Sequence, residues 1–199
     1  VFEIFKELEN NSGFNLEEFW KHSCGVAIAS ESLAERFELK HCDQAYSCGL
    51  LHDLGKVAKL KFSSENFFRE IQYAFENNLS FHSTELNFRS LQHDVLGALV
   101  VQKWGISPIV EQSTRWHHTV KKSMRMGVED PNIHKLIDLV GLANHIIKDI
   151  DFGNSGYKVK LSLAPEFLRR RKIDDQEFEK CKEVVQDALN AESEHLAIF

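Results

Sequence analysis

Apolar side chains recur every three or four residues along most of this chain, and this spacing constrains its fold more than any other feature. A helix turns once every 3.6 residues, so the pattern places apolar side chains along one helical face. No internal repeat, low-complexity tract or linker interrupts it. The predicted helices are 16–37, 45–60, 67–75, 85–104, one opened by Ser107-Pro108, 133–150, 165–171 and 174–191. The chain is therefore predicted to be all-α, a single helical bundle.

Short polar residues and prolines mark the starts of several of these helices. Asn15 and Asp43 are placed to cap the first two, since their side chains accept hydrogen bonds from the free N–H groups of a first helical turn. Ser107 caps the later helix in the same way, and the fixed φ of Pro108 suits a first helical position.

A chain of 199 residues supports one packed core and is short for two. One domain spanning 1–199 is expected, with its motifs within 18–145 and C-terminal helices within 162–193. Residues 151–157 are glycine-rich and predict a loop. Apolar and polar residues alternate over 158–163 as in a β-strand, but no nearby segment offers a strand to pair with. Because the sequence opens at Val1 inside a helical pattern, we expect a piece of a longer protein, with an upstream signalling module or protein partner.

Charge and cysteine content narrow the functional classes. A net charge of −6 and a pI of about 5.9 argue against a nucleic-acid-binding surface, and the basic run 169–172 fits a solvated helix end better. No apolar run approaches the roughly 18 residues that cross a bilayer, and no signal peptide opens the chain. The four cysteines lack Cys-x-x-Cys spacing, so reduced thiols and a cytoplasmic protein are expected, although a Cys24–Cys48 approach stays open.

The pair His52-Asp53 stands among leucines in the run Gly-Leu-Leu-His-Asp-Leu-Gly-Lys. An aspartate buried there is costly unless it is paired, hydrogen-bonded or bound to metal. Imidazole supplies one metal ligand, and a carboxylate has two oxygens that can bridge two ions. Lys56 follows His52 by four residues, on the same helical face, where it could direct a cation to a metal-bound phosphate.

Further histidines could complete such a site. His117 and His118 are adjacent at a predicted helix end, where two imidazoles can converge on one ion, and His22 and His93 lie in other helices. Taken singly, a helical histidine is more often a core hydrogen-bond partner, His-Asp can be an ion pair and His-His a surface accident. One metal site explains all of them together, so we favour the metal. The remaining polar-flanked histidines, expected at the surface, are His41, His82, His134 and His195.

These motifs resemble the HD superfamily of metal-dependent phosphohydrolases, and within it the bacterial HDOD group. They follow that family's order over about residues 18–145 and are specific as a set. The matching stretches are 19–23, 49–56, Glu85 with His93, Gly97-Ala98, 104–108 and His117-His118.

The resemblance implies two overlapping metal sites. The first would be His22, His52, Asp53 and Asn144, and the second Asp53, His93, His117 and His118. The family usually has an aspartate where Asn144 stands, so the first site should be weaker; Asp138 is an alternative ligand six residues earlier. The glycine-tyrosine-proline signature of the subgroup that cleaves cyclic dinucleotides is missing after His118. One or two divalent ions are expected, with Fe, Mn, Ni and Zn equally compatible.

The sequence leaves two functions open and disfavours a third, a purely structural helical bundle, because six ligand positions are retained. The HDOD likeness favours a regulatory or signalling domain that retains its metal centre. The alternative is an active phosphohydrolase acting on a phosphate ester or nucleotide, with Asp53 bridging the ions and Lys56 offsetting charge in the transition state. In either case a phosphate-containing small molecule is the expected ligand.

Overall fold

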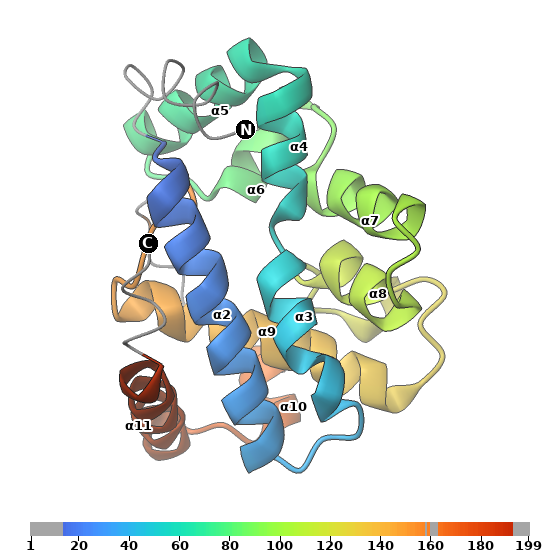
Figure 1. Cartoon of the computed structure of the whole chain (residues 1–199), viewed down its shortest axis with the longest axis vertical. Helices are drawn as coiled ribbons and strands as arrows, with labels where there is room; N and C mark the ends of the chain where they lie inside the picture. Colours follow the sequence, from blue (N-terminus) through green and yellow to red (C-terminus); the bar gives the residue numbers. More distant parts are fainter. Residues whose placement is uncertain (1–13, 158, 160–162, 193–199) are drawn as a thin grey trace.

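The computed structural model describes residues 14–157, 159 and 163–192, and its regular structure there is helical throughout (Figure 1). The α-helices are α2 (Leu16–Arg36), α3 (Ala45–Leu51), α4 (Leu54–Phe62), α5 (Ser64–Glu76), α6 (Phe81–Phe88), α7 (His93–Lys103), α8 (Pro108–Trp116), α9 (Pro131–Asp149), α10 (Pro165–Arg171) and α11 (Asp175–Ala191). Two short 3₁₀ helices are η1 (Cys42–Gln44) and η2 (Lys122–Met124). The predicted all-α class is confirmed.

The longest helix, α2, forms the axis of the bundle, with α3, α9 and α11 packed against it (Figure 1). The main apolar core lies between these helices and includes Val26, Leu33, Val140 and Ile146, each with none of its surface exposed. Burying such side chains contributes about 1.5–3 kcal/mol each relative to exposure. This core fixes α2 and α9 side by side, and both helices carry predicted site residues.

A second, aromatic cluster lies beneath α4, α5 and α6. The rings of Phe19, Phe14, Phe67 and Phe81 pack there in that order, with the centroids of successive rings 5.0–5.6 Å apart. Edge-to-face and tilted pairs of this kind are favourable because the positive ring edge meets the negative ring face. The cluster backs onto the site, since the ring of His93 lies 5.6 Å from that of Phe81.

Most predicted helix starts agree with the structure. Asn15 Oδ1 accepts from Glu18 N at 2.8 Å, and Ser107 Oγ accepts from Ile109 N at 3.2 Å. Asp43 does not act as predicted: it lies within η1, and α3 begins without a side-chain cap.

Two predicted helices are each divided in two. The chain breaks between α3 and α4 at His52 and Asp53, where one helix was predicted over 45–60. It breaks again between α6 and α7, inside the helix predicted over 85–104, after Arg89 adopts a left-handed conformation with φ of 51°. Both breaks precede or contain a predicted metal ligand, so they set the directions of those side chains.

Helices α4 and α7 cross at two glycines, Gly55 and Gly97. A Cβ at position 55 would overlap the carbonyl oxygen of His93, and one at position 97 would lie 3.0 Å from Gly55 N. Only the absence of side chains allows this approach. It brings Asp53, two residues before Gly55, close to His93.

Other features of the described chain bear on the expectations from sequence. All four cysteines are free thiols. None of the described helices combines the length and apolar character needed to span a bilayer. The predicted loop over 151–157 is present, whereas much of 158–163 and the helical pattern at the N-terminus lie outside the described residues.

Candidate metal centre

Asp53 lies at the break between α3 and α4, and only 1% of its surface is exposed. Three imidazoles from different parts of the chain surround its carboxylate. His93 Nε2 is 3.1 Å from Oδ1, His52 Nε2 is 3.3 Å from Oδ2, and His117 Nε2 is 3.7 Å from Oδ1. The structure therefore brings together side chains separated by more than sixty residues in the sequence.

The potential ligands form two groups that share Asp53. The His93 group consists of Asp53, His93, His117 and His118, and the His22 group of His22, His52 and Asp53. Within each group, one ligand atom per residue lies within 4.8 Å of all the others. Apart from Asn144, the two groups match the two ligand sets implied by the family resemblance.

Three of the imidazoles are held through Nδ1, which leaves Nε2 directed at the centre. His93 Nδ1 donates to Glu85 Oε2 at 2.7 Å, His117 Nδ1 to Thr114 O at 2.8 Å, and His52 Nδ1 to Gly49 O at 2.7 Å. Such outer contacts fix the tautomer and the ring orientation of metal-binding histidines. In the neutral form of each ring, a lone pair on Nε2 is then available to an ion.

Unpartnered polar atoms support the fit of an ion. His22 is fully buried, yet neither ring nitrogen has a hydrogen-bond partner in the part of the chain that the structure describes, and His117 Nε2 and Asn144 Oδ1 are also without one there. Buried polar atoms rarely remain unsatisfied, because desolvation without a partner is costly. In addition, His93 Nε2 and His118 Nε2 are 3.0 Å apart. Two nitrogens each about 2.0–2.1 Å from one ion at a right angle are separated by about 3 Å.

The electrostatics keep most of the imidazoles neutral. Burial lowers the pKa of His117 to about 4 and holds the pKa values of His22 and His118 well below the usual value. The neutral form is the one that ligates metal. Burial would also lower the pKa of His93, but the Glu85 carboxylate and Asp53 raise it. Burial would raise the pKa of Asp53, yet Lys56 and His52 hold it well below its usual range, so the carboxylate is ionised.

Lys56 is buried beside Asp53, with 1% of its surface exposed. Its Nζ donates to Asp53 Oδ2 at 2.7 Å and to the carbonyl of Ser155 at 3.0 Å. The ammonium therefore stabilises the carboxylate charge. It does not line the cavity described below, where the sequence-based role would place it.

Glu85 has a structural role that the sequence reasoning did not assign. Besides the bond to His93 Nδ1, its Oε1 accepts from His93 N at 2.9 Å and from Lys59 Nζ at 2.8 Å. Lys59 also donates to Glu70 Oε2 at 2.6 Å. This buried chain of charges ties α4, α5 and α6 to the backbone and ring of His93.

Two other positions differ from expectation. His82, expected at the surface, is half-buried and stacks on His118 with ring centroids 4.5 Å apart. Asp138, offered as an alternative ligand, is paired with Arg125 at 2.6 Å and with Arg170 at 2.8 Å. Its carboxylate is thus engaged away from the histidines, and Asn144 remains the candidate on α9.

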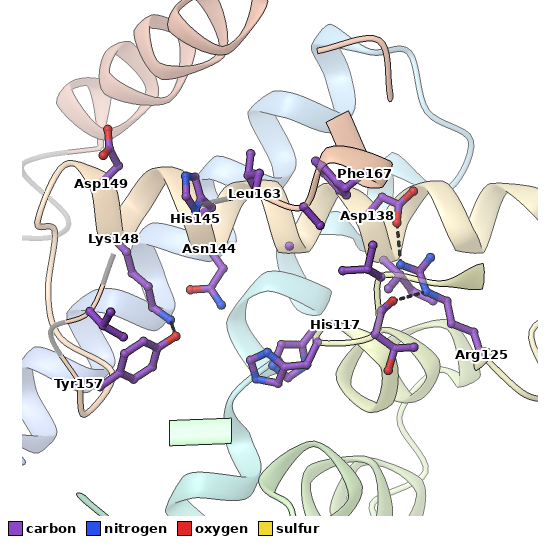
Figure 2. Close-up of a pocket in the computed structure, with 17 residues that line it drawn as sticks. His117, Arg125, Asp138, Asn144, His145, Lys148, Asp149, Tyr157, Leu163 and Phe167 are labelled. Carbon is purple, nitrogen blue, oxygen red and sulfur yellow. Dashed lines mark hydrogen bonds and ion pairs between the residues drawn. The ribbon is translucent and has the colours of Figure 1, made fainter. Parts of the chain in front are cut away.

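A cavity of about 210 Å³ opens beside the histidines (Figure 2). His117, His118 and Asn144 form part of its wall, and Lys148 and Tyr157 form another part. Figure 2 shows the Asn144 side chain directed from α9 toward His117, with the Lys148 ammonium and Tyr157 hydroxyl meeting nearby. The centre is therefore accessible to a small molecule from this side.

The profile of the HDOD domain family matches residues 1–120, which is more than half of the chain. The chain belongs to the HDOD family. Solved structures similar to this HDOD chain include an HDOD domain protein of unknown function from Geobacter sulfurreducens, with a TM-score of 0.67 and 20% identity over 96% of this chain and 65% of the other. A presumed phosphohydrolase from Shewanella amazonensis SB2B has a TM-score of 0.57 and 22% identity, and the match covers 87% of this chain and 65% of the other. A presumed signal transduction protein from Marinobacter aquaeolei VT8 has a TM-score of 0.66 and 16% identity, and the match covers 90% of this chain and 39% of the other. At these identities the likeness concerns the fold.

Two curated relatives are much longer than this HDOD chain. An uncharacterized protein of Treponema pallidum (strain Nichols) is 26% identical over 74% of this chain and 27% of its own length. Ribonuclease Y of Mycoplasmoides gallisepticum is 25% identical over 77% of this chain and 28% of its own length. The chain thus spans just over a quarter of these relatives.

Proposed function

We propose that this chain is a regulatory HDOD domain that binds one or two divalent metal ions between α2, the α3–α4 break, α7, the end of α8 and α9. The observation that carries the proposal is the convergence of imidazoles from separate helices on the buried, ionised carboxylate of Asp53. Mn, Fe, Ni and Zn all suit an imidazole-rich, carboxylate-bridged donor set. The ligand residues would be His22, His52, Asp53, His93, His117, His118 and Asn144.

Two features favour regulation over hydrolysis. A bound ion would polarise a phosphoryl group and lower the pKa of a water ligand. Asn144 brings no charge to the His22 group, which weakens the second ion that such chemistry commonly uses. Lys56 is held by Asp53 and Ser155, so its ammonium is not free to meet a phosphate. Through the bound ion and its ligand, the domain would signal to a protein partner or to another module of a longer chain.

The alternative is an active phosphohydrolase. The geometry of the His93 group favours it, because three imidazoles and a carboxylate lie close together beside an open cavity. In that case Asp53 would bridge the ions, and Lys56 would support the Asp53 charge rather than touch substrate.

Metal analysis and turnover assays separate these proposals. Elemental analysis of the purified protein should find Fe, Mn, Ni or Zn at one or two equivalents, and absence of metal after reconstitution would refute the metal centre. Bis(p-nitrophenyl) phosphate and nucleotides would then be assayed with Mn²⁺ or Fe²⁺ added. No turnover in the wild type with turnover in Asn144→Asp supports the regulatory domain. Robust wild-type turnover that Asp53→Ala abolishes supports the enzyme.

A further inference from the structure

Lys148 is a cation in the cavity wall that the metal centre does not use. It lies one helical turn after Asn144 on α9, and its pKa is lowered to about 8 by burial. Among the described residues, no carboxylate forms an ion pair with its ammonium, and the more distant charge of Asp53 only partly opposes the lowering of its pKa. Because the ammonium is half-buried and forms no ion pair with the described carboxylates, the position is suited to an anion from outside the chain.

Tyr157 adds a second donor at the same point. The Lys148 ammonium donates to the Tyr157 hydroxyl oxygen and lies 4.0 Å from the centroid of its ring. The phenol oxygen is thus the acceptor in this contact, which leaves its O–H free to donate. Burial raises the pKa of Tyr157 to about 12, so the O–H is retained at neutral pH. Together the two side chains offer an anion one charged and one neutral hydrogen bond.

The position of this pair relates the anion to the metal centre. Residues four apart on a helix have Cβ atoms about 5–6 Å apart, so Lys148 lies next to Asn144 on the cavity wall. His117 and His118 line the same cavity. Figure 2 shows the Lys148 and Tyr157 side chains and Asn144 facing one open space. An anion held by the pair therefore lies beside the metal-binding side chains.

The rest of the wall limits the remainder of the ligand. Ile137, Val159, Leu163 and Phe167 supply apolar surface. Arg125 also lines the cavity, but it already donates to Thr119 O, His134 O and Asp138 Oδ1. The volume of about 210 Å³ is below the roughly 300–1,000 Å³ typical of drug-sized ligands. A compact ligand with one anionic group fits, and a dinucleotide does not.

We propose that the cavity binds a small phosphomonoester, whose phosphoryl group accepts hydrogen bonds from Lys148 and Tyr157 beside the metal centre. The proposal rests on the proposed function, since it names the ligand of the same site. A phosphomonoester is favoured over a carboxylate because its three terminal oxygens can meet Lys148, Tyr157 and the metal side together.

Calorimetry with glycerol 2-phosphate at pH 7 tests the proposal, with glycerol as the uncharged counterpart and inorganic phosphate as the free anion. Binding is measured for EDTA-stripped protein and for protein loaded with Mn²⁺. We expect glycerol 2-phosphate to bind in both states, more tightly with Mn²⁺, and glycerol not to bind. Lys148→Met should weaken the affinity at least tenfold and Tyr157→Phe about threefold, because each removes a hydrogen-bond donor while keeping most of the side-chain volume. Lys103→Met removes the same charge from the exposed end of α7 and should leave the affinity unchanged.

The outcomes separate this proposal from the metal centre. If wild-type protein binds Mn²⁺ but no glycerol 2-phosphate, or if Lys148→Met binds it as wild type does, the ligand proposal is wrong and the metal centre stands. If stripped protein binds glycerol 2-phosphate through Lys148 but no metal binds, the metal centre is wrong and the anion site stands. Inorganic phosphate binding as tightly as the ester would overturn the role of the apolar wall. Circular dichroism of Lys148→Met shows whether it folds, and Tyr157→Phe serves as the test if it does not.

Discussion

The His93 group and the His22 group share Asp53 but differ in how their other ligands are held. In the His93 group, Glu85 and the Thr114 carbonyl orient two imidazoles through Nδ1. In the His22 group, the Gly49 carbonyl orients His52 in the same way. Neither nitrogen of His22 has a hydrogen-bond partner among the described residues, and the neighbouring candidate Asn144 is a neutral amide whose oxygen also lacks one there. Ligands that are oriented before binding lose less freedom when they bind. The His93 group should therefore fill first and bind its ion more tightly.

The largest effect is expected from a change at Asp53, the residue that the two groups share. Asp53→Asn should reduce the affinity for both ions by more than about 100-fold, because the only carboxylate in either group loses its charge. Elemental analysis after dialysis measures this. Asp43→Asn changes an exposed aspartate in η1 and serves as the control. Full metal content in Asp53→Asn would contradict the arrangement.

The next effect concerns only the His93 group. Glu85→Gln should weaken its metal affinity by roughly 10–100-fold, the usual cost of losing an outer carboxylate. Glu70→Gln provides a matched control, because it breaks the same Lys59 network without touching His93. We expect Glu70→Gln to lower the unfolding temperature and leave the metal affinity unchanged. Equal losses of affinity in both variants would show that the network acts only through stability.

A smaller effect should appear in the His22 group. Asn144→Asp adds a charge where an unpartnered amide oxygen now lies, and should raise the affinity for the second ion about tenfold, or about 1.4 kcal/mol. Titration with Mn²⁺ would then give two equivalents at a concentration where the wild type binds one. Asn190→Asp, on the exposed face of α11, is the control. An unchanged stoichiometry would place Asn144 outside the site.

A separate effect, on folding and not on metal affinity, is the pH dependence of stability in metal-free protein. The unfolded pKa of a histidine is about 6.5, and that of His117 in the fold is about 4 because of burial. The unfolded chain therefore binds more protons between these values, so the free energy of unfolding falls as the pH falls from 6.5 toward 4. His117 contributes roughly 3 kcal/mol over this range, and His22 and His118 act in the same direction, while His93 opposes them. Urea unfolding in EDTA at pH 7.5 and pH 5 checks the sign; equal or greater stability at pH 5 would contradict it.

The sequence predicted the helices but not the two breaks that shape the site. Helical spacing continues through His52-Asp53 and through Arg89, and neither place has a proline or glycine at the break itself. Arg89 adopts a left-handed conformation that sequence patterns rarely indicate for arginine. The positions of these breaks depend on the tertiary packing around Asp53 and His93. The spacing of apolar residues along the sequence does not show that packing.

The ligand residues could be proposed from the sequence because histidine and aspartate are unusual in an apolar run. Their partners could not. The family resemblance singles out Glu85 with His93, but the sequence does not show that this carboxylate holds the imidazole, and Lys148 reads as the polar face of an amphipathic helix. His82 was expected at the surface because its neighbours are polar, yet it packs on His118. These contacts depend on how α6, α7 and α9 pack, which only the structure provides.

The crossing of α4 and α7 at Gly55 and Gly97 sets the distance between the candidate ligands Asp53 and His93. With backbone touching backbone, no side chain can be repacked there to absorb a movement, so a shift of one helix passes directly to the other. Asp53 and His93 are consequently held at a separation set by main-chain thickness. If an ion is bound as proposed, a movement that separates these two helices would also open its coordination, and metal occupancy would then be coupled to the shape of the domain.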